Sequence, residues 1–265
     1  MTYTKSERFG RGPHLNPRQQ RIVRRLDEED KLRVSTLSSD FGVTEETIRR
    51  DLEFLEKHEL LIRVHGGAIP KEKTEGFELP VLDRQSKNMK EKKAIAAMAA
   101  SFINDGEIIA LDASTTCLQL AKNLHHKQLT VITNSISVSI ELAHQKDITV
   151  ILTGGYLRVE SMSLVGISSD KIINDYHVDK FFISCSGIDL KWGVSESHEL
   201  QAQTKKRIAS LAEQTFVLAD HSKFGHKSLV HWLPTEKIHT IISDQQLDDD
   251  IAKQYQSAGI YVHRV

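Results

Sequence analysis

Two adjacent arginines, Arg49 and Arg50, stand near the start of an acid-rich stretch, EETIRRDLEFLEK, over residues 45–57. Arginine can form two parallel hydrogen bonds with guanine or grip a phosphate oxygen, so the pair is a candidate for contact with DNA. The plainer interpretation is a surface helix in which Glu46 and Arg50 form an ion pair across one turn. The elements around the two arginines decide between these interpretations.

The periodicity around the arginines predicts a helix that begins after a Thr44 cap and runs to about His58. Three apolar residues at helical spacing define its buried face: Ile48, Leu52 and Leu55. The first two turns then present four polar side chains away from that face or on its flanks: Glu46, Thr47, Arg49 and Arg50. Acidic residues farther along the helix would repel a phosphate backbone, which confines contact with DNA to these two turns.

The residues before this helix predict two further helices. Asn16-Pro17 is a good helix start, with Asn as the cap and Pro in the first turn. Ser35 is expected to cap a second, short helix that stops at Gly42. A strand-like run over residues 60–64 follows the third helix and ends in His65-Gly66-Gly67. Three helices and a small hairpin have the layout of a winged helix-turn-helix.

In that layout the hairpin forms a wing that reaches the phosphates or the minor groove of DNA. Arg63 and His65 would lie on the wing, and Gly66 and Gly67 would form its turn. Glycine suits the turn because it accepts positive φ and allows another backbone to approach closely. The predicted contacts with double-stranded operator DNA are Ser35, Thr44, Glu46, Thr47, Arg49, Arg50, Arg63, His65, Gly66 and Gly67.

Composition and charge divide the chain into four parts. Residues 1–15 lack an apolar period, and residues 1–25 carry seven basic side chains against one acidic side chain. We therefore expect residues 1–15 to be a disordered basic arm, which either lies along DNA or does nothing specific. Residues 16–70 form the predicted winged helix-turn-helix, and the charged residues 71–88 form a linker. Residues 89–265 are long enough for a second domain.

From Met89 onward, short apolar strands alternate with helices. The predicted strands are Ile108–Leu111, Leu129–Thr133, Ile148–Leu152, Lys180–Cys185, Phe216–Ala219, Thr240–Ser243 and Ile260–Val265. The predicted helices are Glu91–Asn104, Thr116–Asn123, Ser135–His144, Ser168–Asp175, Glu199–Glu213 and Asp249–Ala258. Short buried strands separated by helices imply an α/β fold, with an open, mostly parallel sheet and helices on both faces.

Polar residues and glycines follow several of these strands, at the carboxyl edge where open α/β sheets bind ligands. Ser114, Thr115 and Thr116 come after the first strand and open a helix whose free N–H groups could hold a phosphate. The other strand ends supply Asn134, Gly154, Gly155, Gly187, Asp189 and Lys223. Each of these turns is common by itself, but five of them at one edge favour a small, anionic, hydroxylated ligand.

The segment VSTLSSDFGVTEETIRRDLEFLEKHELLIRVHGGA, over residues 34–68, resembles the N-terminal domain of the DeoR family of bacterial transcription regulators. Three later segments, LDASTT, LTGGYLRVESMSLVG and LADHSKFG, resemble the sensor domain of that family. The resemblance extends from Asn16 to the last residue. It implies a winged helix joined to a sensor domain that resembles sugar-phosphate isomerases.

The resemblance also implies a function. Members of this family typically repress a carbohydrate catabolic operon as oligomers, commonly dimers or tetramers, and a phosphorylated sugar releases them from the operator. By resemblance, the phosphate would be held by Ser114, Thr115, Thr116 and Lys223. The sugar hydroxyls would contact Asp112, Asn134 and Asp189, and Glu196 and Lys205 are further candidates. Residues 185–208 resemble the branch that regulates L-rhamnose use, which would make the effector a ketose 1-phosphate.

Two other functions fit the sequence. Side chains suited to acid–base chemistry leave open a sugar-phosphate isomerase with an appended DNA-binding module, and the sequence does not separate a repressor from an activator.

The thirteen histidines lack zinc-ligand spacing, and two cysteines are too few for a disulfide framework, so neither a metal nor a cofactor is expected. No apolar run is long enough to span a bilayer and no secretion signal is visible, which indicates a cytoplasmic protein.

Overall fold

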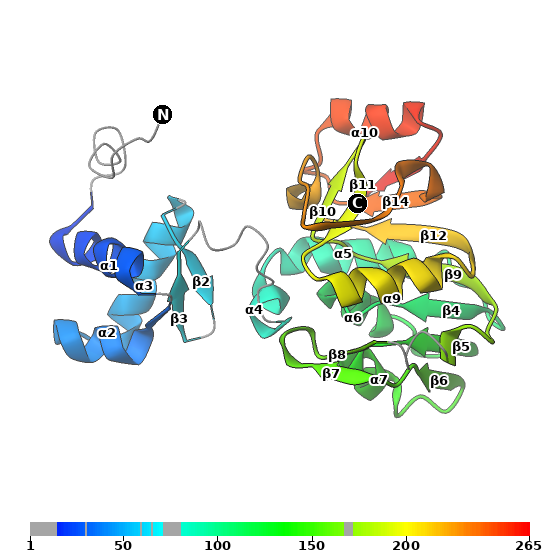
Figure 1. The fold of residues 1–265 in the computed structure, drawn as a ribbon, viewed down its shortest axis with the longest axis horizontal. Helices are drawn as coiled ribbons and strands as arrows, with labels where there is room; N and C mark the ends of the chain where they lie inside the picture. Colours follow the sequence, from blue (N-terminus) through cyan, green and yellow to red (C-terminus); the bar gives the residue numbers. More distant parts are fainter. Residues whose placement is uncertain (1–14, 30, 59, 65, 71–80, 167–171) are drawn as a thin grey trace. The chain divides into compact units, whose positions relative to one another are not determined.

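The computed structural model describes residues 15–29, 31–58, 60–64, 66–70, 81–166 and 172–265 (Figure 1). Contacts within the chain divide it into two units, Met1–Phe77 and Glu78–Val265. The predicted basic arm lies outside the described residues except for Leu15, which is buried in the apolar core of the first unit.

The described residues of the first unit form three helices and a small antiparallel sheet. Its elements are α1 (Pro17–Glu28), β1 (Leu32–Arg33), α2 (Val34–Phe41), α3 (Glu45–Lys57), β2 (Ile62–Val64) and β3 (Gly67–Ile69). In the sheet, β3 lies between β1 and β2 and pairs antiparallel with both. Ile48, Leu52 and Leu55 of α3 are at most 1% exposed and belong to a core that all three helices share. The predicted winged helix-turn-helix is confirmed.

Two of the predicted helix caps are present. The side chain of Asn16 accepts a hydrogen bond from the backbone N–H of Gln19, and the Gln19 side chain accepts one from the backbone N–H of Asn16. This reciprocal pair is a capping box, which satisfies two N–H groups at the start of α1. Thr44 caps α3 in a simpler way, because its hydroxyl oxygen accepts the N–H of Thr47.

The predicted cap at Ser35 is wrong. Helix α2 begins at Val34, and Ser35 is an exposed residue within the helix. The sheet causes this shift, because β1 pairs with β3 up to Arg33 and the N–H of Val34 donates to the carbonyl oxygen of Gly66 at 2.8 Å. The backbone of the hairpin, which the residue pattern does not show, therefore sets the start of α2.

Gly66 and Gly67 are needed for different reasons. Gly66 has φ of +72° with open space around it, so it provides the left-handed turn between β2 and β3. Gly67 is buried in β3, where a Cβ atom would lie 1.8 Å from the carbonyl oxygen of Leu32 in β1. His65, which precedes them, lies outside the described residues.

The second unit is built on a seven-stranded sheet in which all neighbouring strands run parallel. The strand order is β15-β14-β12-β9-β4-β5-β6. The strands are β4 (Ile108–Leu111), β5 (Leu129–Thr133), β6 (Ile148–Leu152), β9 (Val178–Ile183), β12 (Ala212–Leu218), β14 (Thr240–Ser243) and β15 (Tyr261–Arg264). They correspond to the seven predicted strands, with ends shifted by a few residues, and confirm the predicted α/β architecture.

Helices cover both faces of this sheet (Figure 1). One face packs against α5 (Met89–Ala100), α6 (Thr115–Ala121) and α7 (Ile136–Leu142), and the other against α9 (Glu199–Ala209) and α10 (Asp249–Ser257). Phe181 and Phe182, neighbours in β9, belong to different core clusters, because successive side chains of a strand point to opposite faces. The first half of the predicted helix at 168–175 falls outside the described residues, and of the second half residues 172–173 are helical.

Short antiparallel strands complete the unit, and none of them was predicted. Strand β7 (Tyr156–Arg158) pairs with β8 (Ser163–Val165). Strand β11 (Gly193–Glu196) pairs with both β10 (Gly187–Asp189) and β13 (Val230–Leu233). Strands of three or four residues are too short for an alternation of polar and apolar residues to be recognised.

The structure differs from the predicted linker 71–88 in its second half. Residues 71–80 lie outside the described residues, but α4 (Val81–Ser86) is a helix of the second unit. Val81 and Asp83 are buried, at 5% and 7% exposure. A helix of six residues is too short to show a helical period in the sequence, so only the contacts of α4 with the rest of the unit reveal it.

Replacing Gly67 with alanine is expected to destabilise the first unit by about 3 kcal/mol, the upper part of the range for an overpacked core. The new Cβ atom would overlap the carbonyl oxygen of Leu32 and separate β1 from β3. Gly66→Ala is the matched control, because its Cβ would meet no atom and would add only about 1–2 kcal/mol of left-handed strain. Urea denaturation measures both losses, and equal losses would contradict the separate roles of the two glycines.

Candidate DNA-binding and effector sites

Helix α3 presents both predicted arginines to solvent. The side chain of Arg49 is 56% exposed and that of Arg50 is 77% exposed. Each pairs with the glutamate four residues earlier: Arg49 Nη2 lies 2.7 Å from Glu45 Oε2, and Arg50 Nε lies 3.3 Å from Glu46 Oε1. Exposed pairs of this kind contribute only about 0.3–0.5 kcal/mol, so a polyanion could displace the glutamates easily.

A buried carboxylate sets the rotation of α3. Asp51 is 5% exposed, and its two oxygens accept hydrogen bonds from Arg18 Nε and from Gln19 Nε2, the latter at 3.0 Å. Both partners belong to α1. Because neighbouring helix residues are about 100° apart, holding Asp51 inward turns Arg50 toward solvent. The sequence analysis missed this role, although Asp51 stands three residues after Ile48 and therefore on the buried side.

Arg63 is paired with acidic residues of α3. Its backbone N–H donates to Glu56 Oε1 at 3.0 Å, and its Nε lies 3.4 Å from Glu56 Oε2. Its Nη1 lies 3.8 Å from Glu53 Oε2. Arg63 thus offsets the negative charges of Glu53 and Glu56, acidic residues of the later part of α3, where repulsion of DNA was expected. The predicted contact of Arg63 with a phosphate would require these pairs to open.

In the second unit, three strands and a helix meet at a buried ion cluster. Lys205 of α9 places its Nζ atom 2.7 Å from Asp112 Oδ2, after β4, and 2.5 Å from Glu196 Oε1, at the end of β11. The same ammonium donates to the carbonyl oxygen of Ser184 at 2.8 Å. The three charged side chains are at most 7% exposed. We call Asp112, Glu196 and Lys205 the Lys205 cluster.

Burial and ion pairing shift the pKa values of Lys205 and Asp112 in opposite directions. Burial alone would lower the pKa of Lys205, but the charges of Asp112 and Glu196 outweigh it and hold that pKa above its ordinary value. Burial would raise the pKa of Asp112, but Lys205 and the hydrogen bonds around the carboxylate hold it below its ordinary value. Lys205 and Asp112 are therefore both charged at neutral pH.

The Lys205 cluster gives Asp112, a predicted contact of a sugar hydroxyl, a structural role. Asp112 is fully buried; its Oδ1 accepts the N–H of Ser114 at 3.0 Å, and its Oδ2 accepts the N–H of Ser184 at 3.0 Å as well as Lys205. Asp112 therefore orders the start of α6 and the end of β9. Glu196 also accepts a hydrogen bond, from Ser186 Oγ at 2.8 Å.

The predicted phosphate-binding hydroxyls lie in the first turn of α6. Ser114 caps the helix, since its Oγ accepts the N–H of Cys117 at 3.0 Å. Thr115 and Thr116 are 5% and 2% exposed. The thiol of Cys117 donates to the carbonyl oxygen of Phe182 at 3.3 Å, and burial raises its pKa well above the ordinary value. Cys117 is therefore buried and unreactive.

A second group of charges follows β12, where a short 3₁₀ helix, η4 (His221–Lys223), begins. Asp220 Oδ1 accepts the N–H of Ser222 at 3.1 Å and the Nδ2 of Asn88 at 2.9 Å. Burial would raise the pKa of Asp220, but the charge of Lys223 and these hydrogen bonds lower it overall. Asn88, which the sequence analysis assigned to the linker, thus reaches the carboxyl edge of the sheet.

The two groups of charges face the same part of this edge. Burial raises the pKa of the Cys185 thiol to about 12, and the same thiol is influenced by Glu196, Lys223, Lys205 and Asp220. Cys185 follows β9, which lies between β4 and β12 in the sheet. Of the predicted effector residues, Glu196 and Lys205 are thus paired directly, and Lys223 follows β12, a neighbour of β9, at the same edge.

Two predicted ligand contacts have other partners in the structure. Asp189 Oδ1 accepts the N–H groups of Lys191 at 3.0 Å and Trp192 at 2.7 Å, so it closes the turn between β10 and β11. Its assignment to a sugar hydroxyl stays a prediction. Asn134 is 4% exposed and its Nδ2 donates to the carbonyl oxygen of Leu164, which ties the end of β5 to β8.

The predicted glycines serve the backbone. Gly187 begins β10 next to the chain at His226, whose carbonyl oxygen would lie 2.4 Å from an added Cβ. Gly154 and Gly155 have φ of +69° and +113° and turn the chain from β6 into β7. None of these observations by itself shows a contact with a ligand.

Sequence reasoning missed a set of buried polar atoms around α9 and the strands that precede and cover it. Four of them have no hydrogen-bond partner among the described residues: Ser197 Oγ, His198 Nδ1, Thr204 Oγ1 and Trp232 Nε1. The ring of Trp232 lies 6.0 Å from Lys205 Nζ, which puts it beside the Lys205 cluster. Buried polar groups normally have partners, so these atoms are candidates for contact with a ligand or water. No residue pattern signals them, because they converge only through packing.

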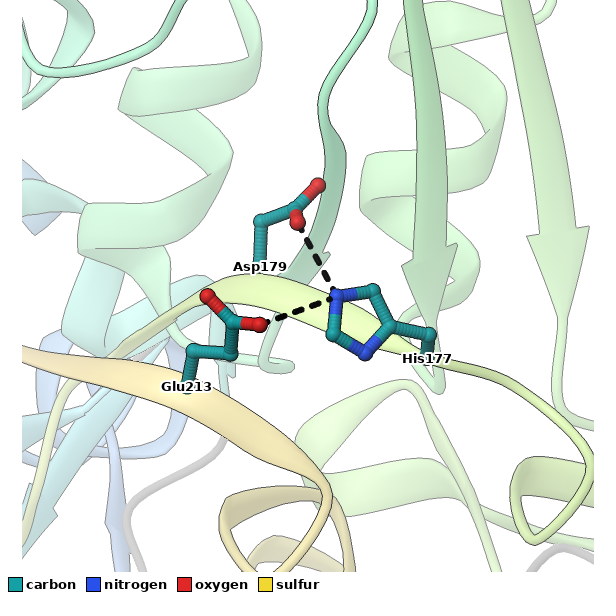
Figure 2. A group of neighbouring side chains, drawn as sticks. All are labelled: His177, Asp179 and Glu213. Atoms are coloured by element: carbon teal, nitrogen blue, oxygen red, sulfur yellow. Dashed lines mark hydrogen bonds and ion pairs between the residues drawn. The ribbon is translucent and has the colours of Figure 1, made fainter.

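Figure 2 shows a different cluster, near the amino ends of β9 and β12. His177 Nε2 lies 3.1 Å from Asp179 Oδ1 and 3.5 Å from Glu213 Oε1. The three ligand atoms lie within 4.8 Å of one another, close enough to hold a metal ion, although none of the side chains is buried. The sequence analysis did not identify this group. It occupies the edge opposite the strand ends that carry the Lys205 cluster.

Comparison with known proteins settles the family. The DeoR-like helix-turn-helix domain matches residues 18–74, and the DeoR C-terminal sensor domain matches residues 87–245. The chain belongs to the DeoR family. DeoR-family proteins are transcription regulators, so the alternative prediction of an isomerase-like enzyme is set aside.

Among its DeoR-family relatives, the uncharacterized HTH-type transcriptional regulator YulB of Bacillus subtilis is 43% identical, over 94% of this chain and 96% of YulB. The putative aga operon transcriptional repressor of Escherichia coli O157:H7 is 33% identical, over 92% of each chain. A solved ribose 5-phosphate isomerase A from Methanocaldococcus jannaschii aligns with a TM-score of 0.40 and 16% identity, over 52% of this chain and 55% of the isomerase. In the described part of the chain, no helix is long and apolar enough to cross a membrane.

Lys205→Met is expected to destabilise the second unit by about 3–5 kcal/mol, the usual effect of leaving a buried ion partner without its counter-charge. Asp112 and Glu196 would then face each other uncompensated. Lys206→Met is the matched control: this neighbouring lysine is exposed, and its loss should change stability by less than about 0.5 kcal/mol. Chemical denaturation at pH 7 measures the free energy of unfolding of both variants. Similar losses for the two would show that the Lys205 cluster does not stabilise the unit.

The same variant has a predicted pH dependence. In the wild type, the depressed pKa of Asp112 gives stability that is present above the unfolded value of about 3.9 and is lost as pH falls. The raised pKa of Lys205 gives stability that is present below about 10.4 and is lost only as pH rises above that value. Without Lys205 the pKa of Asp112 should rise, so the deficit of Lys205→Met should shrink between pH 7 and pH 5.

Proposed function

We propose that this DeoR-family protein represses a carbohydrate catabolic operon and that a phosphorylated sugar releases it from the operator. One observation carries the proposal: a single chain joins the exposed Arg49–Arg50 pair of a helix-turn-helix to a sheet edge that gathers two lysines and three helix-start hydroxyls. The name of the aga operon relative, a putative repressor, is consistent with it.

The first unit supports contact with DNA through the first two turns of α3. Helix-turn-helix proteins place the N-terminal half of this helix against base edges in the major groove. In this helix, Thr44, Thr47 and the two arginines occupy that half, and the arginines are held only by weak, exposed ion pairs. We therefore propose Arg50 as the base-reading residue and Arg49 as a phosphate contact, because Arg50 is the more exposed and points away from the buried Asp51.

The second unit supports an anionic, hydroxylated effector. Lys223 is half-buried beside the sheet edge and would attract a phosphate, while the start of α6 offers hydroxyls and backbone N–H groups. The unpaired polar atoms of Ser197, His198 and Trp232 would meet the sugar. We propose a ketose 1-phosphate as the first effector to test.

Release would follow from differential binding to two states. An effector that binds better to the state with low DNA affinity must, by linkage, weaken operator binding by the same factor. We propose that the protein acts as a homo-oligomer, since each chain supplies one winged helix and operators of this kind contain two half-sites. Deleting the gene should raise transcription of the operon; a fall in transcription would instead indicate an activator.

Arg50→Ala is expected to weaken binding to an operator fragment, selected from random duplex DNA with the wild-type protein, by about 1–3 kcal/mol. The loss should depend on the base that Arg50 reads, so it should shrink for unspecific DNA. Lys57→Ala is the control, because this exposed lysine ends the same helix, away from its first turns. Gel-shift titration at one salt concentration measures both variants, and equal affinity for wild type and Arg50→Ala would exclude Arg50 from the interface.

Lys223→Ala is expected to bind the same operator normally but to resist release by a phosphorylated sugar, because the cation that attracts the phosphate is gone. Lys227→Ala is the matched control, an exposed lysine four residues along the chain. A panel of pentose and hexose phosphates, including ketose 1-phosphates, is first screened for release of the wild type. Normal release of Lys223→Ala by the active compound would refute the assignment of Lys223 to the phosphate.

A further inference from the structure

Asn88 joins α4 to α5 in an unusual conformation. It is one of three residues other than glycine with positive φ among the described residues, at φ 49° and ψ 40°. It occupies the cap position of α5, yet its side chain makes no capping hydrogen bond. Its Nδ2 instead donates to Asp220 Oδ1 at 2.9 Å and lies 3.4 Å from Ser222 Oγ. The side chain therefore connects the α4–α5 junction to the residues after β12, at the carboxyl edge of the sheet, rather than stabilising its own helix.

Lys92 fastens the same junction from the other side. It is 6% exposed, and its Nζ donates to the carbonyl oxygens of Arg84 and Lys87, both at 2.6 Å. These carbonyls belong to the last turn of α4 and the residues after it. Burial, and to a smaller extent the nearby Lys223, lower the pKa of Lys92 to about 8, although Asp220 acts to raise it. Asn88, Lys92, Asp220 and Lys223 thus form one coupled group.

We propose that the α4–α5 junction is a wall of the effector site and a latch: closed on Asp220 in the DNA-binding state, and opened by an anion bound beside Lys223. The inference rests on the proposed function, because it concerns the same site. The junction is also well placed in the chain, since the first unit ends at Phe77 and α4 begins at Val81.

The exchange of hydrogen-bond partners provides the driving force. Lys92 donates to two neutral carbonyls, and its ammonium would gain an additional Coulomb attraction from a phosphate anion, which a neutral carbonyl does not supply. A phosphate that binds beside Lys223 would compete with Asp220 for Asn88 and with the α4 carbonyls for Lys92. Both changes loosen α4. Because Asn88 already holds a costly backbone conformation, losing its Asp220 bond removes what maintains it.

Asn88→Gly tests the latch, because glycine accepts the left-handed conformation but has no amide group. Without ligand, its affinity for the selected operator should fall roughly two- to tenfold, the effect expected from one lost hydrogen bond. The release of its remaining operator binding by the active sugar phosphate should be smaller than in wild type, because the variant is already partly open. If Asn88 had a purely structural role, Asn88→Gly would lower the amount of active protein. The ratio of its operator affinities with and without effector would then equal that of wild type.

His126→Gly is the matched control, because His126 also has positive φ, at 76°, but lies exposed after α6. It should bind and release the operator like wild type. Amide hydrogen exchange gives a second readout with inorganic phosphate as the probe: residues 81–88 should exchange faster in Asn88→Gly, and faster in wild type once phosphate is added. If Asn88→Gly matches wild type in operator affinity and in exchange, the latch is refuted. If no sugar phosphate releases the wild type from the operator, the proposed function is refuted. The operator affinity and hydrogen exchange of Asn88→Gly, compared with those of wild type, would still test the latch.

Discussion

The buried ammonium of Lys205 is the constraint around which the sensor unit is arranged. It lies between the carboxylates of Asp112 and Glu196 and also donates to the carbonyl of Ser184. A buried charge without a partner costs several kcal/mol, so β4, β9, β11 and α9 must keep their mutual positions for the cluster to remain paired. This requirement places the start of α6 and the charges after β12 at one edge of the sheet. The proposed effector site is therefore organised by residues that themselves have little access to ligand.

Ion pairs serve opposite purposes in the two units. In α3, the pairs of Arg49 and Arg50 are exposed and weak, which leaves the arginines available to an external polyanion. Asp51, in the same helix, is buried and paired with Arg18, which holds the helix at the rotation that exposes Arg50. Permanent pairs thus determine the geometry, and exchangeable pairs are available for binding. The hydrogen bond between Asn88 and Asp220 lies between these two kinds. It is partly buried, like the permanent pairs, but it lies beside the site where an anion would bind and could exchange with it.

Much of the fold was predictable because it depends on local patterns. The spacing of Ile48, Leu52 and Leu55 gave the buried face of α3, and all seven strands of the parallel sheet appeared as short apolar runs. The roles of single polar residues were harder to predict. Ser35, Asp112 and Asp189 have residue types that suit the predicted contacts, but Ser35 lies within α2 rather than at its cap, and Asp112 and Asp189 accept hydrogen bonds from backbone N–H groups. Residue type shows what a side chain can do, and its partners decide what it does.

The sequence by itself determined the order of the seven parallel strands, the helix-turn-helix, the sensor architecture and the family, because periodicity, caps and motifs are carried by nearby residues. Only the tertiary structure decided which charges are paired. It showed that Asp51 faces the core, that Gly67 is needed for the approach of Leu32, and that Asn88 reaches Asp220 across 132 positions. The physical reason is that the free energy of a polar group depends on its burial and its partners. Both are properties of how segments far apart in the chain pack together.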